Sequence, residues 1–351
     1  MHRVGGPGEQ DTGKEELMKE TPHLVGIDVS ARSLKVAVDD GRQEQQSLDF
    51  PNTESGHRCL VRRLTNSGRS ARVVLEASGI YSLDLALALH RAPRIEVMVA
   101  NPRAARDFAK AFMLRSKTDK LDASVLLELV RRMPFVSWQP PRQTAFALRA
   151  FSRRIAALIK IRTQERNRLH AAEHSRESPA AIRRDIEVNL RHLDRRIKRL
   201  EEQAVDVVWE DPGLRHDLVL LTSIRGIARA SALQILAEIR VLPDDLSPRQ
   251  WVAHAGLDPC SFESGESVAK PARISRVGNR YLRSALYMPA LVASRYEPHI
   301  KAFYDELIAR GKKPKQALVA VMRKLLHSIH GMLRTGTDFD GEKFRALAEG
   351  A

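Results

Sequence analysis

Residues 23–39 read HLVGIDVSARSLKVAVD, and this stretch decides the fold of the chain. Residues 23–28 form a short apolar run that ends in Asp28, and residues 33–39 alternate apolar with smaller or polar side chains. Such alternation is typical of β-strands. The stretch therefore predicts a strand, a tight turn and a second strand.

Strands and helices alternate in the segment that follows. The sequence predicts two more strands, at residues 72–76 and 95–99. It predicts helices at residues 58–65, at residues 81–91 and, with a break around 115–118, at residues 108–132. This alternation indicates an α/β sheet. The pair Pro140-Pro141 then marks a boundary, because consecutive prolines forbid a helix and stiffen a linker.

Long, Arg-rich helices are predicted beyond this boundary. Apolar residues recur there at three-and-four spacing on both sides of an interruption near residues 175–179, at Leu148, Phe151, Ile155, Leu158, Ile182, Ile186, Leu190, Leu193, Ile197 and Leu200. The spacing predicts a coiled-coil hairpin or a dimer seam, with a plain helical bundle as the alternative. Further helices are predicted at residues 230–239, 251–256, 281–294 and 315–333.

These patterns divide the chain into domains of two classes, α/β followed by α. We expect an α/β domain at residues 22–140, a coiled-coil helical region at 141–208 and a mostly helical domain at 209–340. A flexible tail is expected at residues 1–21, and a tail is expected at residues 341–351.

The composition favours a nucleic-acid partner. The chain has 58 Lys and Arg against 43 Asp and Glu, a formal net charge of +15. Such an excess repels itself unless it meets a polyanion, and nucleic acid is the commonest one. No apolar run approaches the roughly 20 residues that span a bilayer. No secretory segment precedes residue 22, and the two cysteines, Cys59 and Cys260, are too few for a structural zinc site. We therefore expect a cytoplasmic protein with no membrane partner.

Four acids of the α/β domain have the pattern of a metal site. Asp28 and Glu76 each end a predicted strand, where side chains project into the crevice at the carboxyl edge of a sheet. Asp119 and Asp122 are three residues apart, which places both on one face of a helix. If each acid is considered alone, the favoured interpretation is that it caps a turn or is a solvent-exposed side chain. Together they favour Mg²⁺, or Mn²⁺, because converging carboxylates repel one another without a cation.

The sequence predicts a Gly- and Ser-rich loop near residues 255–283 that leads into a basic helix. It offers backbone amides, hydroxyls and guanidinium groups suited to phosphate. A polar surface loop is the alternative. The candidate backbone contacts are Arg276, Asn279, Arg280 and Arg283, and solvated helix charges are their alternative.

The residue patterns resemble those of the DEDD transposases of the IS110 family. In the first half these are residues 26–30 (GIDVS), 75–81 (LEASGIY), 100–102 (ANP) and 117–123 (KTDKLDA). In the second half they are residues 255–259 (AGLDP), 262–265 (FESG) and 273–283 (RISRVGNRYLR). The resemblance extends from about residue 24 to residue 331.

The resemblance implies a fold, an activity and a set of site residues. It implies a RuvC-like, ribonuclease-H-like first domain whose four acids are Asp28, Glu76, Asp119 and Asp122. It also implies a C-terminal transposase domain that supplies a catalytic serine, here Ser264 by motif position. Family members often carry a second Gly after Ser-Gly, whereas this chain has Glu266, so Ser261 and Ser267 stay open as alternatives.

The resemblance further implies Mg²⁺-dependent cleavage and strand exchange of insertion-element DNA through a phosphoserine linkage. It implies a structured non-coding guide RNA that pairs with donor and target DNA. We expect a homodimer or tetramer in a bacterial cytoplasm, associated with the nucleoid when acting. The alternatives are a junction endonuclease that uses the acids alone and an inactive nucleic-acid-binding relative.

Overall fold

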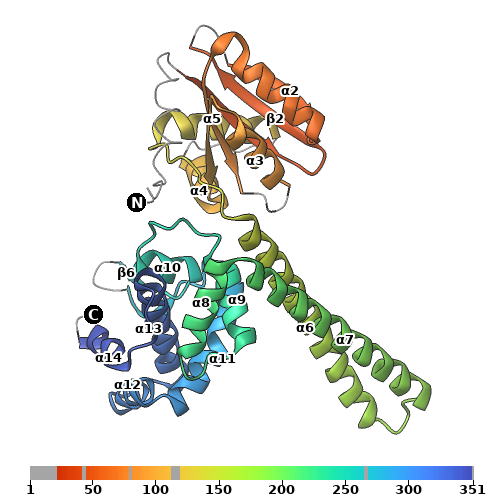
Figure 1. Cartoon of the computed structure of the whole chain (residues 1–351), viewed down its shortest axis with the longest axis vertical. Helices are drawn as coiled ribbons and strands as arrows, with labels where there is room; N and C mark the ends of the chain where they lie inside the picture. The colour runs from red at the N-terminus through yellow and green to blue at the C-terminus, as the bar shows by residue number, and fades with distance from the viewer. Residues whose placement is uncertain are drawn as a thin grey trace, which may run out of the picture. The chain divides into compact units, whose positions relative to one another are not determined.

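The computed structural model describes residues 22–41, 45–77, 79, 81–111, 119–264 and 268–349. The chain divides into two compact units, Met1–Pro140 and Pro141–Ala351, which are drawn in Figure 1 and treated separately below. Within the described ranges, no helix has both the length and the apolar character that crossing a membrane requires.

A five-stranded mixed sheet forms the centre of the first unit, in the order β3-β2-β1-β4-β5. Its strands are β1 (His23–Val29), β2 (Ser33–Asp39), β3 (Gln46–Pro51), β4 (Ala71–Glu76) and β5 (Ile95–Ala100). The first three strands pair antiparallel, whereas β4 runs parallel to β1 and β5 runs parallel to β4. The α/β sheet predicted from the sequence is confirmed, although β3 was not predicted.

Helices pack on both faces of this sheet (Figure 1). The helices α2 (Glu54–Thr65) and α3 (Leu83–Arg91) bury Leu60, Leu64, Leu85 and Leu89 against one face. The helices α4 (Pro102–Ala111) and α5 (Asp119–Arg132) cover the other face, where Val74 packs among side chains of α5. A short 3-10 helix, η1 (Asn66–Gly68), precedes β4.

Two long helices, α6 (Gln143–Glu173) and α7 (Ala180–Glu210), begin the second unit and pack along each other as a hairpin, which we call the arm (Figure 1). Apolar residues of α7 recur at alternating steps of four and three, at Ile186, Leu190, Leu193, Ile197, Leu200 and Ala204. Ile182 was expected in the same stripe but is 53% exposed. It lies in the first turn of α7, near the tip of the arm, where fewer neighbours cover it.

The two ends of the arm meet at Asp211. This buried carboxylate accepts hydrogen bonds from the Thr144 hydroxyl at 2.6 Å and from the Arg142 guanidinium at 3.2 Å, both at the start of α6. It also caps α8 (Pro212–Ser223) by accepting from the amides of Gly213 and Leu214. One side chain therefore closes the base of the arm and begins the next helix.

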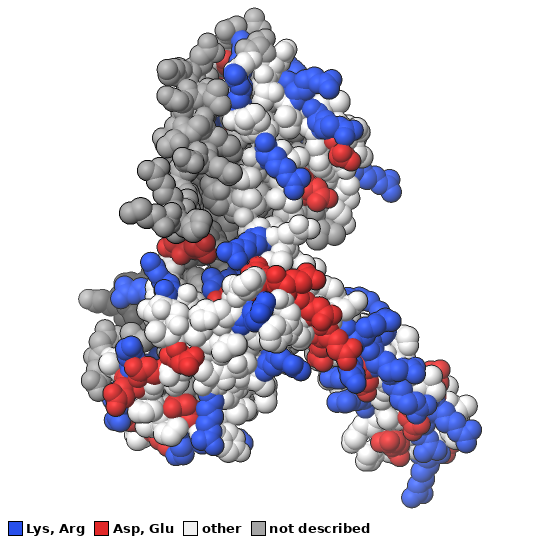
Figure 2. Space-filling view, in the orientation of Figure 1, with Lys and Arg blue, Asp and Glu red and all other residues white. Residues whose placement is uncertain are grey.

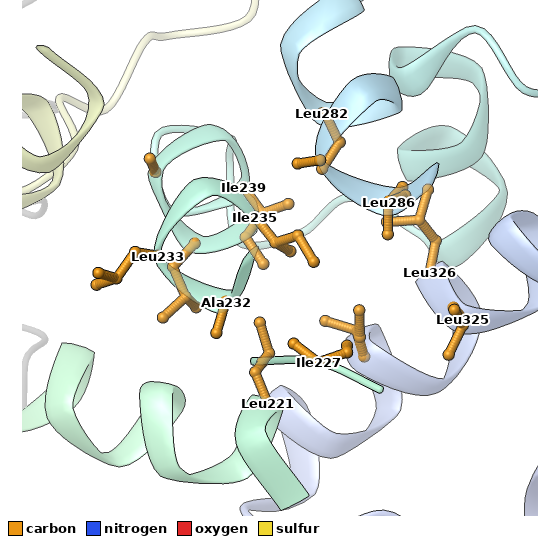
Figure 3. Close-up of a cluster of buried hydrophobic side chains, with 14 of the residues drawn as sticks. Leu221, Ile227, Ala232, Leu233, Ile235, Ile239, Leu282, Leu286, Leu325 and Leu326 are labelled. Atoms are coloured by element: carbon orange, nitrogen blue, oxygen red, sulfur yellow. The ribbon is translucent and has the colours of Figure 1, made fainter. Parts of the chain in front are cut away.

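The remaining helices of the second unit share one hydrophobic core, part of which is drawn in Figure 3. They are α9 (Arg229–Ile239), α10 (Pro248–Ala255), α11 (Arg280–Tyr296), α12 (Pro298–Ala309), α13 (Pro314–Thr335) and α14 (Gly341–Glu349). Between α10 and α11 lies the two-stranded hairpin of β6 (Pro259–Ser264) and β7 (Val268–Ile274). The mostly helical character expected of this part is confirmed.

The expected tail at residues 341–351 differs from the structure, since Gly341–Glu349 forms α14. The segment is short and polar, but the fully buried Phe344 anchors it. The ring of Phe344 contacts those of Phe303 and Phe339, each at a centroid distance of 5.9 Å.

Candidate active site

Asp28 and Glu76 lie at the same edge of the sheet. Ile27 of β1 pairs with Leu75 of β4, so the next residue on each strand occupies the neighbouring position. Parallel strands lie about 4.8 Å apart, and residues in register project from the same face. Both carboxylate side chains are half-buried.

Gly26 shows which face the two acids share. A Cβ atom on Gly26 would lie 2.3 Å from the Ala123 carbonyl oxygen and 2.3 Å from the Leu127 amide nitrogen, both in α5. Because α5 crosses β1 so closely, this position accepts no side chain. Asp28 follows Gly26 by two residues and therefore faces α5. Glu76 likewise follows Val74, which packs against α5.

The direction of α5 brings its first turn toward these acids. At the end of α5, the Arg131 guanidinium donates to Asp39 at 2.7 Å, and Asp39 pairs with Leu24 at the beginning of β1. The opposite end of α5 therefore lies toward Asp28. Asp119 and Asp122 occupy that end.

The structure thus gathers the elements that carry all four predicted acids at one sheet edge. Asp122 is half-buried, whereas the side chain of Asp119 lies outside the described residues. Among the side chains that are described, no three His, Cys, Asp or Glu groups are close enough to hold a metal ion. The metal-binding role of the four acids stays a prediction.

Ser264 is the last residue of β6, where it pairs with Val268 of β7. The stretch interpreted from the sequence as a loop is therefore largely a β-hairpin, and Ser264 lies near its tip. The side chains of Ser261 and Ser264, and Ser267 as a whole, lie outside the described residues. The choice of nucleophile among them stays open.

The base of the hairpin is fixed by hydrogen bonds to α10 and the residues after it. The Ser275 hydroxyl donates to Asp258 Oδ1 at 2.6 Å, and the Ser275 amide donates to the Asp258 carbonyl at 2.9 Å. Gly278 has a φ of 131°, and a Cβ there would lie 2.2 Å from the His254 carbonyl oxygen. The chain therefore passes tightly over the end of α10 before α11 begins.

The four predicted phosphate contacts divide into two pairs. Asn279 caps α11 by accepting from the amides of Tyr281 and Leu282, and Arg283 donates to the Ala255 carbonyl at 2.7 Å. Both side chains thus hold the protein's own backbone. Arg276 and Arg280 are exposed, and Arg276 has a φ of 52°. All four remain predicted contacts, but the exposed pair is the more accessible.

A buried ionic network beneath the hairpin was not predicted from the sequence. The side chain of Glu238, in α9, is 1% exposed and accepts two hydrogen bonds from Arg153 of α6, both at 2.9 Å. Asn279 donates a third hydrogen bond to Glu238 at 2.6 Å. Burial acts to raise the pKa of Glu238, but the hydrogen bonds from Arg153 and Asn279 outweigh it and hold the pKa below its ordinary value. The available signal was a lone acid in the apolar run of residues 232–239.

Basic side chains are spread over the arm. Figure 2 shows Lys and Arg along its visible face, with acids interspersed. Arg162 of α6 pairs with Asp194 of α7 at 2.8 Å, and several arginines of the arm, including Arg154, Arg166 and Arg195, are exposed. This surface is suited to a polyanion.

Comparisons with known proteins match both units. A model of DEDD transposases of the IS110 type matches residues 25–172, and one described as "Transposase IS116/IS110/IS902 family" matches residues 218–305. The pilin gene-inverting protein of Moraxella bovis is 28% identical over 326 residues, which cover 90% of this chain and 97% of that protein. The pilin gene-inverting protein of Moraxella lacunata is similar to the same extent. A protein of insertion element IS110 from Streptomyces coelicolor is 30% identical over 34% of this chain and 30% of its own length.

Proposed function

Because the chain belongs to the IS110 family of transposases, we propose that it cleaves and exchanges DNA strands to move an insertion element. The match to the Moraxella proteins over nearly their whole length supports this activity, since inverting a gene requires strand exchange. The net charge of +15 also suits a DNA substrate.

In this proposal the first unit is a RuvC-like nuclease domain that binds Mg²⁺, or Mn²⁺. Asp28, Glu76, Asp119 and Asp122 would hold the metal, since hard carboxylate oxygens are the ligands these ions take. The observation that carries the proposal is the register of β1 with β4, which places Asp28 beside Glu76. Because Gly26 has no side chain, α5 packs close to β1, and its first turn lies near these two acids. When bound, the metal would stabilise negative charge on the oxygens of the reacting phosphate.

Ser264 is the proposed nucleophile of the second unit. Its Oγ forms a bond to phosphorus while the bond from phosphorus to a sugar oxygen breaks, and the proton of the Ser264 hydroxyl is transferred to that leaving sugar oxygen. The phosphoserine linkage conserves the energy of the broken bond for rejoining. The hydrogen bonds between Ser275 and Asp258 at the base of the hairpin support this role, because a strand that is held in place positions a nucleophile more accurately than a loop.

The arm and the partners complete the proposal. The heptad-like spacing on α7 supports a coiled coil, and the basic surface of the arm suits RNA as well as DNA. We propose that a structured non-coding guide RNA from the same element pairs with donor and target DNA. The acids of the first unit and Ser264 of the second unit are far apart in sequence, and we propose that they assemble into one site between the subunits of a homodimer or tetramer.

The test is to trap the reaction intermediate. The full chain is incubated with Mg²⁺, a plasmid carrying the ends of the element, and a transcript of the DNA that flanks its gene. Protein–DNA adducts are then detected on a denaturing gel. We expect an adduct for the wild type that disappears in Ser264→Ala but persists in the matched variants Ser261→Ala and Ser267→Ala.

Two outcomes would overturn parts of this proposal. Strand cleavage that continues in Ser264→Ala without any adduct would indicate a hydrolytic junction endonuclease. Full activity in Asp122→Asn would contradict the metal-binding role of the acids.

A further inference from the structure

Arg149 is a cation that the proposed mechanism does not use. It lies one turn before Arg153 on the same face of α6, and its side chain is partly buried. Its guanidinium lies over the ring of Phe146, with Cζ 5.4 Å from the ring centroid. Burial lowers the pKa of Arg149, and the charge of Arg153 lowers it further, whereas the charge of Glu238 acts the other way. A guanidinium stays charged even so.

The carboxylate that acts on Arg149 is already engaged. Glu238 Oε1 accepts from Arg153 Nε, and Glu238 Oε2 accepts from both Arg153 Nη2 and Asn279 Nδ2. The charge of Arg153 balances the single negative charge of Glu238. The positive charge of Arg149 is therefore not balanced by a carboxylate, although its side chain is partly buried. Keeping such a charge partly out of water costs free energy unless an anion binds to it.

A third guanidinium, that of Arg280, contacts the same tyrosine ring as Arg153. Arg280 and Arg153 both lie over the ring of Tyr281, with Cζ at 5.0 Å and 4.8 Å from its centroid. Arg280 also donates to the Tyr281 hydroxyl at 3.1 Å. Burial lowers the pKa of the nearby His254, which favours its neutral form. The cluster thus holds three guanidinium groups and the single carboxylate of Glu238.

We propose that Arg149 and Arg280 bind a backbone phosphate of the DNA strand at the base of the hairpin that carries Ser264. This inference rests on the proposed function, and it assigns to the start of the arm a part in holding the substrate. Guanidinium groups are well suited to phosphate because they present several N–H donors in a fixed plane.

The position of the cluster shows which phosphate is bound. His254 and Asn279 belong to the base of the hairpin, whereas Ser264 is the last residue of β6, five residues beyond Pro259. At 3.4 Å per residue, five residues span about 17 Å along the strand. The phosphate held by Arg149 and Arg280 is therefore not the reacting one but lies several nucleotides from it, and it sets the register of the DNA.

The test measures DNA binding and stability together in the full chain. The affinity for a fluorescent DNA duplex is determined over a range of salt concentrations for the wild type and for Arg149→Met, Arg149→Lys and Lys312→Met. Lys312 is an exposed cation of the same unit and serves as the control for net charge. Thermal unfolding of each variant is recorded in parallel.

We expect Arg149→Met to reduce the slope of log K against log salt by about 0.9, which is about an eightfold loss of affinity at about 0.1 M salt. Its melting temperature should stay level or rise, because the substitution removes an uncompensated charge. Arg149→Lys should keep the slope, and Lys312→Met should leave it unchanged. A residue with only a structural role would show the reverse, a lower melting temperature at an unchanged slope.

A slope for Arg149→Met equal to that of the wild type, with the wild type binding DNA, overturns this inference alone. A wild-type chain that does not bind the duplex overturns the proposed function and this inference with it.

Discussion

Replacing Glu238 by Gln tests whether the buried network positions the hairpin that carries Ser264. The substitution keeps the shape of the side chain but removes its charge, so the Arg153 guanidinium loses its ionic partner and one acceptor oxygen becomes a donor amide. Removing one partner of a buried ion pair costs about 3–5 kcal/mol. The side chain of Arg153 remains 42% exposed, so water solvates part of it. We therefore expect a loss of about 2–3 kcal/mol in the free energy of unfolding.

A matched control is available in the same unit. Asp217 of α8 accepts two hydrogen bonds of 2.6 Å from Arg240, and its side chain is only 7% exposed. This pair has the same chemistry as the Glu238 pair but joins α8 to the end of α9 and makes no hydrogen bond to Asn279. Asp217→Asn should therefore destabilise the protein by a similar amount without loosening the hairpin.

The assay combines urea unfolding with amide hydrogen exchange over residues 259–279. In Glu238→Gln the amides of this segment should exchange faster, because Arg153 and Asn279 then compete for the single acceptor oxygen that remains, and strand cleavage should fall. In Asp217→Asn both should stay at the wild-type level. If the two variants change hairpin exchange equally at equal stability, the network is only structural and the reasoning is wrong.

Three more predictions concern other parts of the chain. Gly26→Ala should cost about 3 kcal/mol in urea unfolding, because its Cβ would meet backbone atoms of α5 at 2.3 Å, and only an unchanged midpoint would be inconsistent with the close crossing. Phe344→Ala should cost about 3 kcal/mol and release α14 to proteolysis, whereas a protease-resistant variant would argue against the anchoring role of this ring. The pKa of Glu238 lies below its ordinary value of 4.5. The ionised carboxylate therefore contributes fully to the stability of the protein above pH 4.5, and this contribution is lost as the pH falls through the lowered pKa. Urea midpoints measured below pH 4.5 should therefore drop more steeply in the wild type than in Glu238→Gln, and parallel curves would contradict the ionic role.

The parts of the fold that sequence reasoning predicted are those with strong local patterns. β1 was predictable as a short apolar run that ends in an acid, and β2 was predictable because its apolar residues alternate over a full strand length. β3 was missed because only Leu48 and Phe50 alternate before Pro51, and β3 lies at the edge of the sheet, half-buried. The hairpin of β6 and β7 was interpreted as a loop because its strands contain prolines and glycine follows Ser264, both typical turn signals.

The candidate site was predictable only where residue type and spacing carry the signal. The strand-ending acids Asp28 and Glu76 can be paired from the parallel topology alone. The network around Glu238 cannot be predicted from the sequence, because Arg153 is 85 residues and Asn279 is 41 residues away from Glu238 along the chain. Nothing local distinguishes Arg153 from the other arginines of the arm, so only the folded core could identify it.

The closure of the arm at Asp211 has a consequence for protein engineering. Because Thr144 and Arg142 meet this carboxylate where α7 ends, the arm begins and ends at one place. The length of the arm therefore does not affect the contacts at Asp211 that close its base. Removing seven residues from α6 and the seven residues that face them from α7 would shorten the arm by about two helical turns. The contacts at Asp211 would stay in place, so the length of the arm could be varied in equal steps.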